Sequence, residues 1–340
     1  MKVGVLDATE QKAAVCLRAH AHARTAFLLI PGFSMLGYVS VIEPLRAANQ
    51  LSGEPLYDWV HISPDGSPAA ASNRVRISCD LDVKAANEFD FIFVCGSDEA
   101  VTFDEPHTLA WLRAKAARGA IVAGIGGGAF LMARAGLLRG RRVTLHWAYA
   151  RAFAEQFPKA NLYRSLYEID DDRMSCGGGV SPLDMMHAMI IARHGIGLAL
   201  KVSEWILHTE IRASRESQRL SLEMRLGVKH AGLLRVLKAM DSAIEDPLSR
   251  NELADISGVS ERQLDRLFVS QLGISLSGYY LRQRLTRARS LVSQTAMPIT
   301  EVSIACGFKS ASTFSKSYRS MFAISPSKDR ELTFSQRREK

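Results

Sequence analysis

The spacing of apolar and polar residues divides the chain into two regions. Between residues 26 and 211, short apolar runs that predict buried strands alternate with stretches of helical period. The predicted strands are 26–30, 59–62, 75–79, 89–95, 120–125, 143–146, 162–170 and 174–179, and the predicted helices are 39–49, 107–118, 130–138, 149–157, one beginning at Ser181, and 196–211. This alternation predicts an α/β domain with a mainly parallel sheet sandwiched by helices.

After residue 212 the strand pattern ends, and only helical spacing follows. A charged, polar stretch over residues 213–230 predicts a linker, and residues 231–335 predict an all-α domain. We therefore expect a mobile leader over 1–24, a ligand-sensing α/β domain over 25–212, the linker, and the helical domain. A chain of 340 residues is long enough for two domains.

The helical region contains a pattern typical of a helix-turn-helix unit. Ser249 with Glu252, and Ser260 with Gln263, have the spacing of two capping boxes, and Gly258 provides a corner between the two short helices. The second helix has apolar residues at 264, 267, 268 and 272. Two short helices joined by a tight turn are the geometry that places a helix in the DNA major groove.

The pattern recurs about 50 residues later. Gly307 provides the second corner, Phe308 follows it as an apolar plug, and a helix from Ser310 has inward aromatic residues at 314, 318 and 322. A longer predicted helix over residues 278–295 lies between the two units. Such a helix could hold two recognition helices about one DNA turn apart, about 34 Å.

The charge distribution supports DNA as the partner of the second region. The net charge of +8 is concentrated after residue 247, where 15 Lys and Arg face 8 Asp and Glu, while the preceding residues have 28 against 27. The five cysteines have no metal-ligand spacing, and no apolar run is long enough for a membrane span. We expect a cytoplasmic protein without metal, cofactor or membrane contact.

The helical region resembles the AraC/XylS family of transcription regulators. The matching segments share the family's corners, plugs and inward positions: 252–254, 258–268, 273–275, Tyr280, 284–289, Ile299, 307–308, 314–316, Phe322 and 325–326. Leu276 and Ala323 depart from this pattern, since proline and glycine are usual there. The resemblance implies sequence-specific DNA binding.

The first region resembles the PfpI-type domains of the class I glutamine amidotransferase-like superfamily. Residues 121–125 match the strand before the superfamily's nucleophile, 144–147 match its histidine strand, and 31–33 with 43–49 match the opening strand and helix. A PfpI-type domain followed by an AraC-type domain is the architecture of the GlxA-type regulators.

At one position this domain departs from the superfamily's pattern, and the departure indicates that it has lost its catalytic activity. Enzymes of the superfamily place a cysteine at a sharp strand-to-helix corner, where the helix N-terminus lowers the thiol pKa. The matching residue here is Gly126, and His146 without a thiol cannot perform that chemistry. The alternative is an active PfpI-like hydrolase or glyoxalase-type enzyme with a DNA-binding appendage. Its candidate thiol is Cys176, ahead of a helix that Ser181 and Asp184 would cap, although a buried strand-end cysteine is the simpler interpretation.

We expect the corner to form a pocket for a small effector. The resemblance implies a nitrogen metabolite such as an amino acid or a betaine-like amine. Trp147 and Tyr149 could provide aromatic faces for a cation and Glu43 a counter-charge, although packing and capping would also explain Trp147 and Glu43. The predicted ligand residues are Glu43, Gly126, Gly127, His146, Trp147, Cys176 and Gly177.

The two recognition helices predict unequal roles in DNA binding. Arginine at 262 and 266 can read a guanine edge, whereas the small residues and single lysine of the second helix suit positioning on phosphates. The predicted DNA-binding residues are Arg262, Gln263, Asp265, Arg266, Lys309, Ala311, Ser312, Thr313, Ser315 and Lys316.

The expected partners follow from these readings. They are promoter DNA, a small effector, RNA polymerase and a second copy of the chain, in a regulator that we expect to activate transcription. A constitutive architectural DNA-binding protein is a further alternative, and it predicts that no small molecule changes promoter output.

Overall fold

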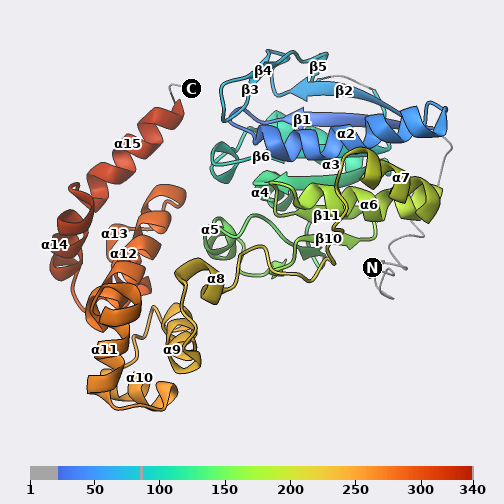
Figure 1. The fold of residues 1–340 in the computed structure, drawn as a ribbon. Coiled ribbons are helices and arrows are strands. Elements are labelled where there is room, and N and C mark those ends of the chain that lie inside the picture. Colours follow the sequence, from blue (N-terminus) through green and yellow to red (C-terminus); the bar gives the residue numbers. More distant parts are fainter. Residues whose placement is uncertain (1–21, 85–86, 339–340) are drawn as a thin grey trace. The chain divides into compact units, whose positions relative to one another are not determined.

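The computed structural model describes residues 22–84 and 87–338 and forms two compact units (Figure 1). The first unit extends to Gln218 and the second begins at Arg219, inside the segment predicted as a linker. The predicted leader lies outside the described residues up to residue 21. Its last two residues, Ala23 and Arg24, already belong to the first strand.

The first unit is built on a seven-stranded sheet with the order β10-β11-β7-β6-β1-β2-β5. Its strands are β1 (Ala23–Leu29), β2 (Tyr57–Ser63), β5 (Leu81–Asp82), β6 (Phe91–Gly96), β7 (Ile121–Gly126), β10 (Tyr167–Asp170) and β11 (Arg173–Cys176). All neighbouring pairs are parallel except β10 with β11. The predicted, mainly parallel sheet is therefore confirmed.

Helices cover both faces of this sheet, which explains its continuous apolar strands. In β1, Phe27 and Leu29 belong to one core, while Ala26 and Leu28 belong to the core on the opposite face. The first core includes buried residues of α2 (Met35–Ser52), α6 (Ser181–His194) and α7 (Ile196–Trp205). The second includes those of the short 3-10 helix η1 (Glu99–Val101), α3 (Pro106–Ala117), α4 (Gly128–Arg134) and α5 (Ala150–Gln156).

Three predicted strands do not lie in the main sheet as expected. Of the stretch 75–79, only β4 (Arg76–Ile77) is a strand, and it pairs with β3 (Ala69–Ala70) in a separate hairpin. The stretch 162–170 is divided between β10 and β9 (Asn161–Leu162). Of the stretch 143–146, only Val143 is in a strand, β8 (Arg142–Val143), and this strand pairs with β9 outside the main sheet. The strands that form here, β4, β8 and β9, have only two residues each, which is too short for the sequence to show which neighbour they pair with.

The helix predicted over 196–211 is shorter than expected, because α7 ends at Trp205. Leu207 has a φ of 58°, which a continuing helix does not permit. Beyond it, His208 and Arg212 both bind the carboxylate of Asp184 on α6. The chain after α7 is thus held against the first unit rather than extended as a helix.

The second unit consists of helices, as predicted. They are α8 (Leu222–Leu226), α9 (Ala231–Ser242), α10 (Arg250–Ser257), α11 (Glu261–Leu272), α12 (Leu276–Gln294), α13 (Ile299–Ala305), α14 (Ala311–Phe322) and α15 (Pro326–Arg338). They surround two separate cores. Helix α12 contributes Leu276 and Tyr280 to the first core and Leu285 and Leu291 to the second, so it joins the two helix-turn-helix units.

Candidate DNA-binding helices and candidate effector site

The two recognition helices, α11 and α14, have the same pattern of burial over all twelve residues. Leu264 and Phe268 are buried in α11, and Phe314 and Tyr318, 50 positions further on, are buried in α14. A capping side chain fixes the start of each helix: the Ser260 hydroxyl accepts from the N–H of Gln263, and that of Ser310 from the N–H of Thr313. The exposed positions of the two helices therefore correspond one to one.

Of the residues of α11 predicted to bind DNA, Arg262 and Arg266 are exposed, whereas Gln263 and Asp265 bond to other residues of the protein. Within the described ranges, neither Arg262 nor Arg266 has an ion-pair partner, whereas Asp265 pairs with Arg250 of α10. The Gln263 carboxamide accepts from the N–H of its own cap residue, Ser260, at 3.1 Å. Asp265 and Gln263 thus already have structural roles, while the arginine side chains are available to DNA.

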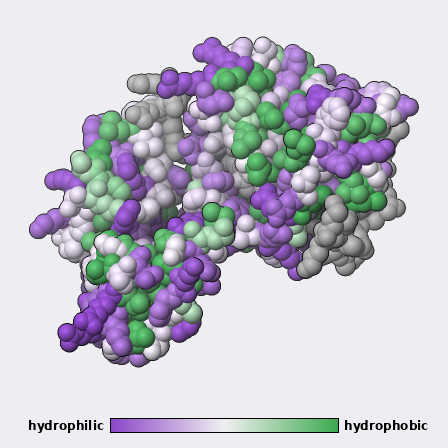
Figure 2. All heavy atoms as spheres, in the orientation of Figure 1, coloured by the Kyte–Doolittle hydropathy of each residue, from purple (hydrophilic) through white to green (hydrophobic). Residues whose placement is uncertain are grey.

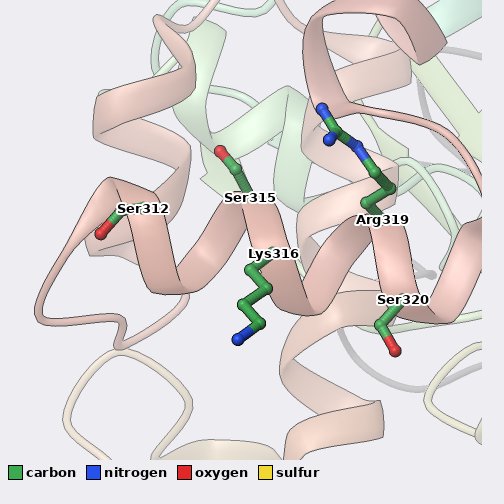
Figure 3. Close-up of a pocket in the computed structure, with 5 residues that line it drawn as sticks. All are labelled: Ser312, Ser315, Lys316, Arg319 and Ser320. Atoms are coloured by element: carbon green, nitrogen blue, oxygen red, sulfur yellow. The ribbon is translucent and has the colours of Figure 1, made fainter.

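On α14 a shallow pocket of about 460 Å³ lies along the exposed face. Figure 3 shows five side chains that line it, all projecting from this helix: Ser312, Ser315, Lys316, Arg319 and Ser320. Arg319 and Ser320 were not among the predicted DNA-binding residues. The 3-and-4 spacing that joins 312, 315, 316 and 319 was the signal that could have included Arg319.

Each corner of the two helix-turn-helix units is held by an arginine from the preceding helix. Arg235 of α9 donates to the carbonyls of Ile256 and Ser257, both at 3.0 Å. Arg284 of α12 donates to the carbonyl of Cys306 at 2.8 Å and to that of Gly307 at 2.6 Å. Helix α12 has 19 residues and is about 28 Å long, comparable to the spacing of about 34 Å that successive major grooves require.

In the first unit, Gly126 lies at the corner between β7 and α4. Its φ of 61° is in the left-handed region, and the following residue, Gly127, is the N-cap of α4. A side chain at Gly128 would collide with the carbonyl of Val94 on β6. This glycine run therefore lets the helix begin directly against the sheet.

Cys176 ends β11 beside this corner, since it pairs with Ile125 of β7. Burial raises the pKa of its thiol to about 12, although hydrogen bonds from the N–H groups of Gly178 and Gly126 oppose the rise. A thiol with this pKa is protonated at neutral pH and lacks the nucleophilic thiolate form. The geometry favours the interpretation of Cys176 as a buried strand-end residue.

The capping box predicted after Cys176 is wrong. The N-cap of α6 is Val180, without a side-chain cap, and the Ser181 hydroxyl donates to the carbonyl of Gly178. The Asp184 side chain is fully buried and binds Arg212 at 2.6 Å and His208 at 2.9 Å. These partners come from residues far along the chain, so local spacing could not reveal them.

The loop between β8 and α5 brings three rings together near a carboxylate. The ring centroid of His146 lies 5.3 Å from that of Trp147 and 5.6 Å from that of Tyr149. Burial lowers the pKa of His146, and its Nδ1 accepts from the N–H of Ala148, so the neutral form is favoured. The Tyr149 hydroxyl donates to Asp98 at 2.6 Å. The aromatic faces expected for a ligand are therefore clustered.

Glu43, the predicted counter-charge, lies on α2. Its carboxylate accepts from Arg46 of the same helix at 2.8 Å. This ion pair competes with the expected role in effector binding, which stays a prediction.

Gln218, the last residue of the first unit, completes the candidate effector site and was missed by sequence reasoning. Its Oε1 accepts from the N–H of Trp147 at 2.8 Å. Its Nε2 lies within hydrogen-bonding distance of three oxygens: Thr144 Oγ1 at 3.2 Å, Leu145 O at 3.0 Å and Ser165 O at 2.6 Å. The residue falls in the predicted linker, and no motif distinguishes it there.

Comparison with known proteins matches both units. A helix-turn-helix domain model matches residues 253–331, and the DJ-1/PfpI family model matches residues 23–178. The chain is 42% identical over 306 residues to the HTH-type transcriptional regulator CdhR of Pseudomonas aeruginosa, covering 90% of this chain and 91% of that protein. It is 40% identical over 305 residues to the HTH-type transcriptional regulator GlxA of Rhizobium meliloti, covering 89% and 94%.

Among solved structures, an AraC family transcriptional regulator from Pseudomonas putida has a TM-score of 0.50 at 24% identity, covering 54% of this chain and 99% of that one. This likeness supports the fold alone. None of the described helices has the length and apolar character needed to cross a membrane. In the same part of the chain, no cluster of His, Cys, Asp or Glu could hold a metal ion.

Proposed function

This chain belongs to the HTH-type transcriptional regulators that join a DJ-1/PfpI domain to an AraC-type DNA-binding domain, and we propose that its first unit senses a small effector without catalysing a reaction. The observation that carries the proposal for the second unit is the shared burial pattern of α11 and α14, which presents two matched exposed faces with basic residues. Gly126 at the corner and the buried thiol of Cys176 support a non-catalytic first unit.

Assays for amide, peptide and glyoxal turnover would test the absence of catalysis. We expect wild-type protein and Cys176→Ala to be equally inactive, because neither has a reactive thiolate at the corner. Activity in the wild type that disappears in Cys176→Ala would support the enzyme alternative instead.

We propose that the effector is a small nitrogen metabolite, such as an amino acid or a betaine-like amine. The clustered rings of His146, Trp147 and Tyr149 and the nearby Asp98 support a site for a polar or cationic nitrogen group. A thermal-shift screen of such metabolites on the full chain would test this, since a ligand that binds only the folded state raises the melting temperature. If no small molecule changes melting or promoter output, a constitutive architectural role would explain the protein better.

We further propose that α11 reads bases and α14 mainly positions the protein on phosphates. Arg266 is exposed and not neutralised by Asp265, so its guanidinium can form two hydrogen bonds to a guanine edge. The matched position of α14 is Lys316, which shares its pocket with Arg319 and three serines. Two cations among small hydroxyl side chains suit backbone contacts.

Binding titrations on a randomised operator library would test this division. Arg266→Ala should weaken cognate binding by about 1–3 kcal/mol and relax base preference within one half of the site. Lys316→Ala should weaken cognate and scrambled sites alike and lower the salt slope by about one unit. Unchanged preference in Arg266→Ala with altered preference in Lys316→Ala would reverse the assignment.

We propose that the protein is a cytoplasmic homodimer that activates transcription together with RNA polymerase. Support for self-association comes from exposed apolar residues on α2 and α7, two helices that pack together in the first unit; Figure 2 shows apolar surface on this unit. These residues are Leu36, Val39, Ile196 and Leu200. Sedimentation should show a dimer that Leu200→Glu weakens, and a wild-type monomer would contradict this part of the proposal.

A further inference from the structure

We infer that the site around Gln218 is a carboxamide-binding site, filled by the chain's own glutamine until an effector with the same groups replaces it. The inference rests on the proposed function, because it names the effector chemistry and the way in which binding reaches the interdomain chain. It also assigns a role to a residue outside both the predicted corner and the recognition helices.

The site satisfies both halves of a primary amide. Three oxygens from Thr144, Leu145 and Ser165 surround Nε2, and the N–H of Trp147 donates to Oε1. Three of these four groups belong to the backbone, so they recognise hydrogen-bonding pattern rather than charge. The Thr144 hydroxyl itself donates to the Ser165 carbonyl at 2.9 Å, which orients its lone pairs toward the amide.

The backbone also provides a flat surface for the amide. A Cβ added at Gly177 would lie 2.9 Å from Cδ of Gln218, closer than packed carbon atoms approach. Gly177 follows Cys176, whose strand pairs with β7 where it reaches Gly126. The glutamine side chain therefore lies beside the corner at which the sequence predicts effector binding.

This arrangement defines the ligand class. A ligand must bring N–H donors beside a carbonyl or carboxylate oxygen, as in a primary carboxamide or in the ammonium and carboxylate of an amino acid. Of the effectors proposed above, this selects the amino acid over the betaine-like amine. A quaternary amine has no N–H, so the Leu145 carbonyl would lose the donor that Gln218 provides, and the Ser165 carbonyl would keep only the Thr144 hydroxyl. Sites built to hydrogen bond a substrate group strongly reject analogues without it, because buried polar groups are then left unpaired.

The segment that ends in Gln218 is also held to the first unit at earlier positions. Its start is held by the buried Asp184, which accepts from His208 and Arg212, and the carbonyl of Ser214 accepts from the N–H of Leu166 at 2.7 Å. An ion pair to a buried carboxylate is stronger than the neutral bonds of Gln218. An effector would thus displace the weaker contacts, those of Gln218, immediately before the second unit begins at Arg219.

Hydrogen exchange on the full chain tests the inference without DNA. In Gln218→Ala, amides of residues 144–149 should exchange faster, because the N–H of Trp147 loses its acceptor. Propionamide should restore their protection, with an apparent affinity at least about tenfold higher in the variant than in the wild type, since an internal competitor that fills about nine-tenths of the sites lowers affinity by that factor. Gln50→Ala, an exposed glutamine of α2, is the matched control and should behave as the wild type.

Gln218→Glu provides a second variant of equal size. It keeps an acceptor for Trp147 but loses the donors to the three oxygens, so it should also free the site for propionamide. Equal protection of residues 144–149 in all variants, or equal affinity for propionamide, would overturn the inference. Glycine betaine, which has a carboxylate but no N–H donor, should give no protection, and protection equal to that by propionamide would also overturn it.

Two outcomes distinguish a failure of this inference from a failure of the proposed function. If propionamide competes with Gln218 as expected but no metabolite changes DNA binding, the carboxamide-binding site is supported and the proposed response of DNA binding to an effector is contradicted. If metabolites alter DNA binding while hydrogen exchange at residues 144–149 is unaffected by substitution of Gln218, the effector response is supported and the carboxamide-binding site is contradicted.

Discussion

Replacing Arg284 by lysine should loosen the second helix-turn-helix corner without changing the charge of the protein. The guanidinium donates to two carbonyls at that corner, those of Cys306 and Gly307, and lies 4.1 Å from the centroid of the Phe308 ring. It is half-buried, and burial lowers its pKa. A lysine can reach one carbonyl at a time and has no planar group to stack on the ring.

The expected loss follows from these contacts. One charge-assisted hydrogen bond contributes about 1.5–3 kcal/mol, and the cation–π contact about 0.5–1 kcal/mol. Partial exposure reduces both, so we expect Arg284→Lys to lower the free energy of local opening by about 2 kcal/mol, which raises the open population about 30-fold. At the first corner, Arg235 also donates to two carbonyls, but its side chain is exposed and stacks on no ring of the described residues. Arg235→Lys should therefore lower the free energy of local opening by only about 1 kcal/mol.

Native-state hydrogen exchange of the peptides covering residues 299–310 measures this opening. The informative amides are those of Gly307 and Phe308, which donate to the carbonyls of Ile304 and Ser303. Arg282→Lys, at an exposed position of the same helix, is the control and should stay within about 0.5 kcal/mol of the wild type. If Arg284→Lys changes exchange no more than this control does, the corner does not depend on the bidentate contact.

Three further predictions concern other parts of the chain. Ala323 ends α14 with a left-handed φ of 57°, so Ala323→Gly should stabilise the second unit by about 1 kcal/mol in thermal unfolding, and a lowered melting temperature would contradict this. Asp184→Asn leaves the Arg212 guanidinium without its buried carboxylate and should lower the free energy of unfolding of the first unit by about 3 kcal/mol in urea. Tryptophan fluorescence reports the unfolding of this unit alone, because all four tryptophans precede residue 219. A loss below about 1 kcal/mol would refute this prediction. Burial raises the pKa of Cys176 to about 12, so its thiol stays protonated across pH 7–9. Iodoacetamide should therefore label the half-buried Cys79 before Cys176, with no rise in Cys176 labelling over that range, and labelling of Cys176 ahead of Cys79 would disprove the assignment.

Much of the fold could be predicted because its signals are local. Capping serines, corner glycines and apolar positions recur within four residues of one another, and the structure confirms the capping boxes at Ser249 and Ser260. The buried strands β6 and β7 were equally clear, since both of their faces are apolar. Short strands such as β4 and β9 were misplaced, because two residues do not specify a pairing partner.

The candidate site was only partly predictable for the opposite reason. Gly126 and His146 were found through motifs, but Asp184 was assigned to a cap, although its partners His208 and Arg212 lie more than 20 residues away. Gln218 has no motif, and its bonding partners precede it by 53 to 74 residues. Contacts between irregular segments are set by tertiary packing, which a periodic pattern does not record.

The repeated burial pattern of α11 and α14 has a consequence for the DNA that the protein recognises. The two helices have the same framework but different exposed chemistry: Arg266 in one corresponds to Lys316 in the other, and Arg262 to Ser312. If the operator were inverted, α11 would face the half of the site that fits α14, and α14 would face the half that fits α11. If both helices contact the operator as proposed, a single chain imposes a direction on its binding site, and an inverted copy of that site is a different ligand. Regulation of a promoter would then depend on the orientation of its operator as well as on the base sequence.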